Sequence, residues 1–320
     1  MAQIRVAFLG PAGSFSHEAA LQLYGPSAAE FVPCVSFAVA FSAVQRKTAH
    51  CAVIPFENST NGSVVQTLDL LADHGNLYSD IVVHDEHYLA VHHCLLAHKN
   101  AAVQQGPDSS YRSITKLYTH PQAWGQCEQF LSRYYKGVER QDVSSTSKAA
   151  EIVSRDATGQ SAAIASRFAA DHYGTSILEA NIEDKHENTT RFLVLRNLES
   201  MRTDGAAGLP ETDNNTMASH IEISPPSQKQ KVLIAFTINH SSPGALADAL
   251  LTFKTHGMNL TSINSRPSLV RAWQYIFFVE CEAISHAHFD DVAEKMLQGL
   301  RNVTESCRNL GNWRDRLLAG

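Results

Sequence analysis

The chain has 320 residues, of which 44% are hydrophobic and 18% are charged, and its formal net charge is -6. This composition is that of an ordinary soluble protein, and the length suggests two or three domains. The negative balance gives no reason to expect a nucleic-acid partner, and no apolar run approaches the ~20 residues that a membrane-spanning helix needs.

The N-terminus and the cysteines indicate the cellular compartment. Met1 is followed almost at once by a β-prone run, without the pattern of a secretory signal. The six cysteines are scattered without a CxxC pair, and several stand in apolar contexts, which is typical of reduced thiols. We therefore expect a cytoplasmic protein, although a processed plastid form would look the same.

The first part of the chain alternates strands and helices. Apolar, β-prone runs predict strands at 4–9, 31–35 and 51–55, with a helix after each. This alternation predicts a mainly parallel sheet that helices cover on both faces. Ligands bind beyond the carboxyl ends of such strands, so the polar loops 10–17 and 56–63 are candidate binding loops.

Both loops carry side chains of chemical interest. Gly10 permits a tight turn, and Ser14 or Ser16 is expected to cap the next helix, whose first N–H groups suit an anion. Glu57 is the only carboxylate of the second loop. It is either a general acid with a raised pKa or an anchor for the loop amides, and we favour the structural role.

Residues 78–96 are extended and mostly apolar, and they include histidines that suggest a zinc site. His84 and His87 would face opposite sides of a strand, and no third ligand stands at a recognisable interval. We therefore predict no metal here. A long extended segment is better suited to a crossover into a second lobe.

The alternation then repeats, with strands predicted at 113–118, 138–143 and 162–165. A helix is expected after His120, with Pro121 near its first turn. A lobe inserted in this way would return the chain to the first sheet. It would leave a cleft between two α/β lobes, and hinge closure would exclude water from that cleft.

The most informative stretch runs from Asn188 to Leu195. Its apolar second half, 192–195, reads as a buried strand, and the residues ahead of it place hydroxyls and a guanidinium at the strand mouth. The Thr190 hydroxyl can donate a proton or a hydrogen bond, and Arg191 can hold a carboxylate through two parallel bonds. The pattern indicates either a site for a small-molecule acid or a capped strand end with a surface arginine.

Residues 199–228 are rich in polar residues, glycine and proline, which predicts a flexible linker. Beyond it, strands and helices alternate in the order βαββαβ. That order predicts a small α+β, ferredoxin-like domain.

These segments together resemble prephenate dehydratase, the enzyme that turns prephenate into phenylpyruvate in phenylalanine synthesis. Each string alone is weak, but six in the family's order are specific. They are GPAGSFSH (10–17), IPFENSTNGSV (54–64), HPQAWGQC (120–127), SSTSKAA (144–150), AAIAS (162–166) and NTTRFLVL (188–195). The strings PGALADAL (243–250) and NSRPS (264–268) resemble the family's ACT regulatory domain, although Asn264 stands where the family usually has Glu.

The resemblance implies a periplasmic-binding-protein-like catalytic domain at 1–198, with one lobe at about 1–88 and 176–198 and the other at about 89–175. A linker at 199–228 and an ACT domain at 229–320 would follow. It also implies no metal or organic cofactor, a homodimer or homotetramer, and feedback inhibition by L-phenylalanine at ACT–ACT interfaces. No chorismate mutase segment precedes these motifs, so we expect a monofunctional enzyme.

The resemblance also assigns roles to individual residues. Thr190 would protonate the leaving hydroxyl of prephenate, with Glu57 or water as a relay, and Arg191 would hold a carboxylate. The implied substrate-binding residues are Ser14, Asn58, Ser63, Thr119, Gln126 and Phe192. The implied phenylalanine-binding residues are Gly244, Ala245, Leu246, Asn264, Ser265 and Arg266.

Two other functions stay open at this point. Arogenate dehydratase acts on the aminated substrate, and the residues that choose between keto and amino groups are not evident here. A non-catalytic amino-acid-binding sensor shares the two-lobed fold. The missing signal peptide and the Thr190–Arg191–Phe192 motif count against the sensor.

Overall fold

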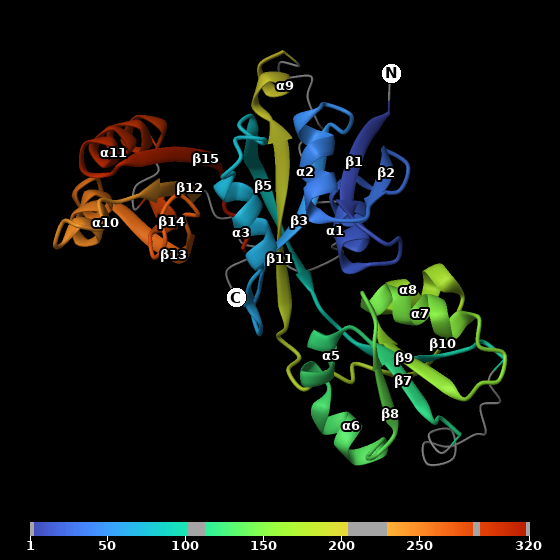
Figure 1. Cartoon of the computed structure of the whole chain (residues 1–320). Helices are drawn as coiled ribbons and strands as arrows, with labels where there is room; N and C mark the ends of the chain where they lie inside the picture. Colours follow the sequence, from blue (N-terminus) through green and yellow to red (C-terminus); the bar gives the residue numbers. More distant parts are fainter. Residues whose placement is uncertain (1–2, 101–112, 204–228, 284–288, 318–320) are drawn as a thin grey trace, which may run out of the picture.

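The computed structural model describes residues 3–100, 113–203, 229–283 and 289–317. Their strands form a 6-stranded, a 5-stranded and a 4-stranded sheet, which we call the sheets of the first lobe, the second lobe and the C-terminal domain. Figure 1 shows the C-terminal domain beside the first lobe and the second lobe beyond the end of the first sheet. No helix in these ranges is long and apolar enough to cross a membrane.

The first lobe has a mixed sheet in the order β2-β1-β3-β11-β5, with β4 beside β3. The strands are β1 (Ile4–Leu9), β2 (Ala29–Cys34), β3 (Cys51–Asn58), β4 (Gly62–Ser63), β5 (Ile81–Ala90) and β11 (Thr189–Asn197). β11 runs antiparallel between β3 and β5, so the chain returns to this sheet after the second lobe, as predicted. β3 continues to Asn58, so Glu57 lies in a strand rather than in the expected loop.

Helices cover both faces of this sheet, and the two faces of β11 therefore have different neighbours. α1 (Phe15–Tyr24), capped by Ser14, packs on the face that carries Phe192. α2 (Phe37–Gln45) and α3 (Val65–Ala72) pack on the face that carries Leu193. Because successive strand residues alternate in direction, Thr190 belongs to the α1 face and Arg191 to the opposite face.

The second lobe has a sheet in the order β10-β6-β9-β7-β8. Its strands are β6 (Cys94–Ala97), β7 (Lys116–Thr119), β8 (Glu139–Asp142), β9 (Ser161–Ala165) and β10 (Ser176–Ala180). Its helices are α5 (Pro121–Gln126), α6 (Glu128–Tyr134), α7 (Thr146–Ser154) and α8 (Arg167–Tyr173). The single helix expected after His120 is interrupted at Cys127, whose φ of -127° is not helical.

Two crossing segments join the lobes: residues 91–93 between β5 and β6, and residues 181–188 between β10 and β11. Backbone hydrogen bonds tie them together, from the Val91 N–H to the Asn188 carbonyl at 2.7 Å and from the Ile182 N–H to the His93 carbonyl at 2.9 Å. The two-lobed arrangement with paired crossings is the one that the sequence predicts.

The C-terminal domain has an antiparallel sheet in the order β13-β14-β12-β15. Its elements are β12 (Gln230–Thr237), α10 (Ala245–Thr255), β13 (Met258–Pro267), β14 (Tyr275–Ala283), α11 (Phe289–Val303) and β15 (Ser306–Arg314). They follow the expected βαββαβ order, although the last strand is longer than predicted. α10 and α11 cover one face of the sheet, whereas Leu233, Phe278 and Leu310 on the other face join the core of the first lobe.

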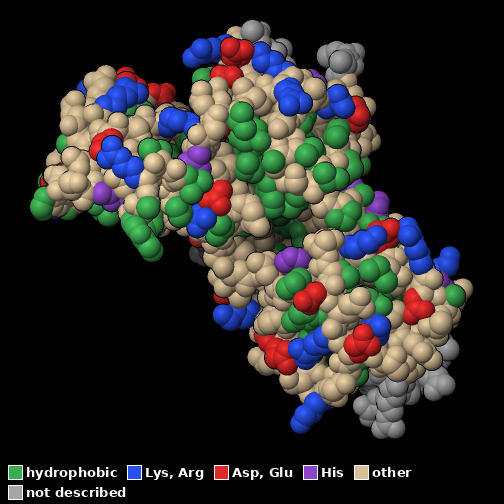
Figure 2. Space-filling model, in the orientation of Figure 1, with side chains coloured by type: hydrophobic (Ala, Val, Ile, Leu, Met, Phe, Trp, Pro, Cys, Tyr) green, Lys and Arg blue, Asp and Glu red, His purple; other side chains and the backbone are tan. Residues whose placement is uncertain are grey.

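Large hydrophobic side chains are exposed at the β13 edge of this domain. β13 is an edge strand on which Leu260 and Ile263 are 38% and 50% exposed, and Trp273 in the next loop is 87% exposed. Figure 2 shows hydrophobic side chains that stand out from the lower edge of the domain.

Part of the predicted linker is helical. α9 (Leu198–Thr203) follows β11 directly, because the Asn197 Oδ1 accepts the N–H groups of Glu199 and Ser200 at 3.0 and 3.3 Å. The rest of that linker, residues 204–228, lies outside the described residues. The domain boundaries themselves stay predictions.

His87 on β5 gives the first lobe a pH-dependent stability. Its side chain is buried beside Gln22, and burial lowers its pKa from 6.5 to about 4. As pH falls, the His87 ring is protonated near pH 6.5 in the unfolded chain but only near pH 4 in the folded chain. The free energy of unfolding should therefore decrease as pH falls from 6.5 to 4, by up to ~3 kcal/mol. Urea unfolding at pH 7 and pH 4.5 measures the loss. His87→Gln should reduce it, and an equal loss in both proteins would contradict this prediction.

Candidate functional site

Asn58 and Thr190 meet at the ends of β3 and β11, where they are register partners. The Asn58 Nδ2 donates to the Thr190 Oγ1 at 3.0 Å and to the Asn188 Oδ1 at 2.8 Å. The Asn58 Oδ1 accepts the backbone N–H groups of Thr60 and Asn61. Because the Thr190 oxygen is already an acceptor in this network, its own hydrogen remains available for donation to a ligand.

Gln126, at the end of α5, pairs with a buried histidine that the sequence did not single out as functional. The Gln126 Oε1 lies 2.6 Å from the Nε2 of His93, which is 1% exposed. An amide oxygen only accepts, so Nε2 carries the proton. The His93 Nδ1 is buried without a partner in the described part of the chain, and burial lowers the pKa of His93, which keeps the ring neutral. This pairing leaves the Gln126 amide nitrogen to donate elsewhere.

Both pairs are attached to the crossing segments. The Asn188 carbonyl accepts a hydrogen bond from the Val91 N–H. His93 lies two residues after Val91, and two residues of extended backbone span ~7 Å. The ring of Phe15, from the polar loop at 10–17, packs edge-on against His93 with 5.9 Å between centroids. Thr190 from the first lobe and Gln126 from the second therefore both lie beside the crossing segments, which the first polar loop also contacts through Phe15.

Ser14 and Thr119 form hydrogen bonds with the backbone. The Ser14 Oγ caps α1 by accepting the His17 N–H and donates to the Leu9 carbonyl. The Thr119 Oγ1 is buried and donates to the Ile164 carbonyl at 2.7 Å. These hydroxyls shape the loop and strand end that carry them, and their contact with a substrate stays a prediction.

The loop at 10–14 also touches the second lobe. The Ala12 carbonyl accepts the Ser147 hydroxyl at 2.6 Å and the Tyr173 hydroxyl at 2.9 Å. Gly13 next to it has φ of +77°, and a Cβ there would lie 3.0 Å from the Ser147 Oγ. A glycine is therefore required for this contact between the lobes.

Arg191, Glu57 and Phe192 do not meet the Thr190 hydroxyl. Phe192 is 1% exposed and packs in the core against α1. Arg191 points to the opposite face, where its Nε lies 2.8 Å from Glu86 and its guanidinium also contacts Glu280. Glu57 is the register partner of Arg191 and shares that face. The structure thus separates Arg191 and Glu57 from Thr190, and their predicted catalytic roles are not used in the function proposed below.

Ser63 and several predicted effector residues lie where the first lobe meets the C-terminal domain. The Ser63 Oγ donates to the Asn264 Oδ1 at 2.6 Å. The Arg266 guanidinium makes two bonds to Asp69 on α3, at 2.6 and 3.1 Å. Ser265 is exposed on β13 between these contacts.

The remaining predicted effector residues lie at the start of α10. Gly244 has φ of +84°, Ala245 is buried, and Leu246 packs against the core of the domain. Their effector role stays a prediction.

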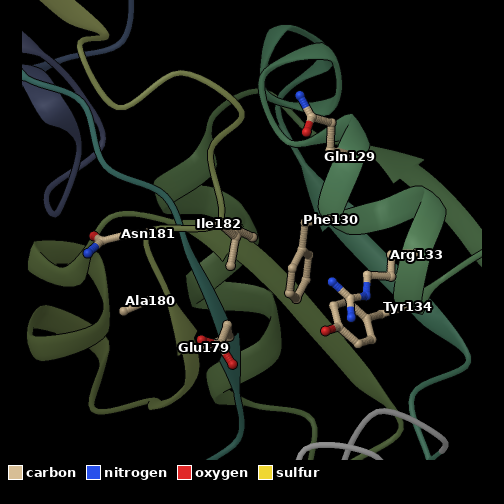
Figure 3. A pocket seen from close by; sticks show the side chains of 8 residues that line it. All are labelled: Gln129, Phe130, Arg133, Tyr134, Glu179, Ala180, Asn181 and Ile182. Carbon is tan, nitrogen blue, oxygen red and sulfur yellow. The ribbon is translucent and has the colours of Figure 1, made fainter.

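A hollow of about 450 Å³ lies elsewhere on the second lobe. Figure 3 shows Phe130, Arg133 and Tyr134 of α6 on one wall and residues 179–182 on the other. It contains none of the residues that the sequence singled out.

The family follows from a comparison with known proteins. Residues 6–200 match the model of a family described as prephenate dehydratase, and this range is more than half of the chain. This chain belongs to the prephenate dehydratase family. The predicted family is therefore confirmed.

Curated relatives match almost the whole chain. It is 34% identical over 316 residues to a bifunctional chorismate mutase/prephenate dehydratase of Aquifex aeolicus, covering 99% of this chain and 75% of the relative. It is 33% identical over 320 residues to arogenate dehydratase/prephenate dehydratase 2 of Arabidopsis thaliana, covering 97% and 73%.

Solved structures give the same result for the fold. A prephenate dehydratase of Arthrobacter aurescens in complex with L-Phe has a TM-score of 0.77 and 25% identity, over 99% of this chain and 92% of that one. GqqA, described as a novel type of quorum quenching acylase, has a TM-score of 0.73 and 27% identity, over 97% of each chain.

Proposed function

We propose that this chain converts prephenate into phenylpyruvate. The observation that carries the proposal is the Thr190 hydroxyl beside the crossing segments, which Gln126 also contacts. Its oxygen is held by Asn58, while its hydrogen stays available. This arrangement occurs in a member of the prephenate dehydratase family. A hydroxyl donor and an amide donor on opposite lobes suit a substrate that bears carboxylates and a leaving hydroxyl.

The chemistry needs one proton at one atom. The bond from the ring to its carboxylate breaks and releases CO2, and the electron pair of that bond completes the aromatic ring. The hydroxyl leaves from the opposite ring carbon and takes a proton, so that water is the other product. Thr190 donates that hydrogen, and a proton from solvent replaces it. A free hydroxyl is a weak acid, so catalysis rests on its fixed orientation toward the departing oxygen.

His93 makes Gln126 a donor on the second lobe. With its oxygen bound by the His93 Nε2, the Gln126 amide presents N–H groups, which suit a carboxylate or keto oxygen of the substrate. Closure of the lobes would bring this donor toward the ligand on Thr190 and exclude water. We infer a periplasmic-binding-protein-like closure from the paired crossing segments.

Arogenate is the main alternative substrate, because one of the relatives above is named for both activities. The purified chain should be incubated with prephenate and with arogenate, and the products identified by mass spectrometry. We expect phenylpyruvate from prephenate at the higher rate. Faster formation of phenylalanine from arogenate would make the chain an arogenate dehydratase, and no product from either would favour a binding sensor.

We also propose that the C-terminal domain is an ACT regulatory domain that binds L-phenylalanine and forms the contacts of a homodimer or homotetramer. Its βαββαβ order and the exposed hydrophobic side chains Leu260, Ile263 and Trp273 at the β13 edge support this proposal. L-Phenylalanine should lower activity and raise the melting temperature through its preference for one arrangement. If it does neither, this assignment fails.

We also propose that the protein is cytoplasmic. All six cysteines are free thiols, and only Cys307 among them is not fully buried, which suits a reducing compartment.

A further inference from the structure

A cluster of five charged side chains is buried between the first lobe and the C-terminal domain. Arg191 and Glu86 come from β11 and β5, whereas Lys231 and Glu280 come from β12 and β14, and Asp315 follows β15. None is more than 9% exposed. We call these residues the interdomain cluster.

Each member of the cluster is held by more than one partner. The Lys231 Nζ lies 3.0 Å from the Glu86 Oε1 and 2.8 Å from the Asp315 Oδ1. Arg191 contacts both Glu86 and Glu280. The second carboxylate oxygen of Glu280 accepts the Thr261 hydroxyl at 2.8 Å. Because a buried charge that loses a partner is costly, these contacts resist any displacement of Arg191.

Arg191 is the residue that follows Thr190 on β11, and the sheet is irregular there. The register between β11 and β3 shifts between Arg191 and Phe192, so that Phe56 of β3 forms a bulge beside the site. Bulges interrupt the regular ladder and redirect neighbouring side chains. β11 keeps a regular register with β5 from Thr189 to Val194, so only its β3 side is interrupted here, and on that side the contacts of Arg191 supplement the backbone hydrogen bonds.

We propose that Glu280 of the C-terminal domain is a positioning residue for the dehydration: through Arg191 it fixes β11 so that the Thr190 hydroxyl points at the departing oxygen. This inference rests on the proposed function. A displacement of a reacting group by ~1 Å can cost about a hundredfold in rate, so a contact that never touches the substrate can control turnover. The C-terminal domain then takes part in catalysis even without an effector.

A second interdomain ion pair serves as the control. Arg266 of β13 binds Asp69 of α3 with two hydrogen bonds, and α3 does not carry Thr190. If the interdomain cluster only holds the domains together, removing either connection should have the same effect on turnover. If Glu280 positions Thr190, only the cluster should affect kcat.

The test compares Glu280→Gln with Asp69→Asn in the full chain, with prephenate as substrate. We expect Glu280→Gln to lower kcat about tenfold to a hundredfold while KM changes less than about twofold, and Asp69→Asn to leave both near the wild-type values. Thr261→Val, which removes only the hydroxyl that orients Glu280, should lower kcat about twofold to threefold, and it tests the same contact if Glu280→Gln does not fold. The melting temperature of each variant is measured alongside.

A wild-type kcat in Glu280→Gln would overturn the positioning role. If Glu280→Gln does not fold, a wild-type kcat in Thr261→Val would do the same. An equal loss of kcat in Asp69→Asn would also overturn it. Inactive wild-type protein would instead contradict the proposed function. The two failures are therefore distinguishable.

Discussion

Replacing Thr190 by alanine is expected to lower kcat on prephenate by about two to three decades with the fold intact. The variant keeps the bonds of the Asn58 amide to Asn188 and Thr189. It loses the Thr190 hydroxyl, whose hydrogen this network leaves available for a ligand. Losing one preorganised donor of this kind typically costs ~3 kcal/mol of transition-state stabilisation. Steady-state kinetics with circular dichroism as a check of folding measure the effect.

Two further variants separate chemistry from packing. Thr190→Ser retains the hydroxyl and should recover most of the turnover. Thr189→Ala removes the neighbouring hydroxyl, which donates to the Glu187 carbonyl, and should cost far less than Thr190→Ala. Near-normal turnover in Thr190→Ala would remove Thr190 from the mechanism.

Replacing Lys231 by methionine is expected to lower the free energy of unfolding by about 3–5 kcal/mol. Lys231 is 4% exposed, and its ammonium group neutralises Glu86 and Asp315. Methionine fills a similar volume but leaves those carboxylates buried with less positive charge near them, which is the costly way to break a buried ion pair. Urea denaturation of the full chain measures the loss.

Lys229 offers a matched control next to the same strand. Its side chain is 48% exposed and pairs with Glu282 at 3.1 Å, an ion pair of the surface type that is worth ~0–1 kcal/mol. Lys229→Met should therefore change stability little. An equal decrease in the free energy of unfolding in the two variants would mean that the buried ion pairs of Lys231 stabilise the fold no more than an exposed pair does.

The order of strands and helices could be predicted because hydrophobic periodicity and capping residues are local signals. Ser36 and Ser145 cap the helices expected after them, and the apolar run at 192–195 lies within a buried strand. The lengths of strands were less predictable. β3 and β11 extend through the polar residues Asn58 and Thr189, because pairing between them satisfies backbone groups that the sequence pattern assigns to loops.

Part of the candidate site could also be predicted from the sequence. Asn58 and Thr190 were both expected, and their hydrogen bond brings together residues 132 positions apart. The direction of Arg191 could not be predicted, because it depends on which strand face the C-terminal domain covers. That information lies in contacts with Glu280 and Trp313, far along the chain.

His93 was missed because the sequence shows only a histidine in an extended, apolar segment. Its role follows from the hydrogen bond to Gln126, which depends on how the second lobe packs against the crossing segment at 91–93. The histidines of this segment were considered only as metal ligands, and a metal site was predicted to be absent. In the part of the chain that the structure describes, no group of three or more histidine, cysteine or carboxylate side chains is arranged to hold a metal ion.

A crystal structure of the Thr190→Ala variant grown with prephenate tests the central claim most directly, because a slow variant retains its substrate. We expect the ring of prephenate between the lobes, with its hydroxyl directed at position 190 beside Asn58 and an oxygen within hydrogen-bond reach of the Gln126 amide. Prephenate bound at any other place, with the space between Asn58 and Gln126 occupied by solvent, would contradict the account.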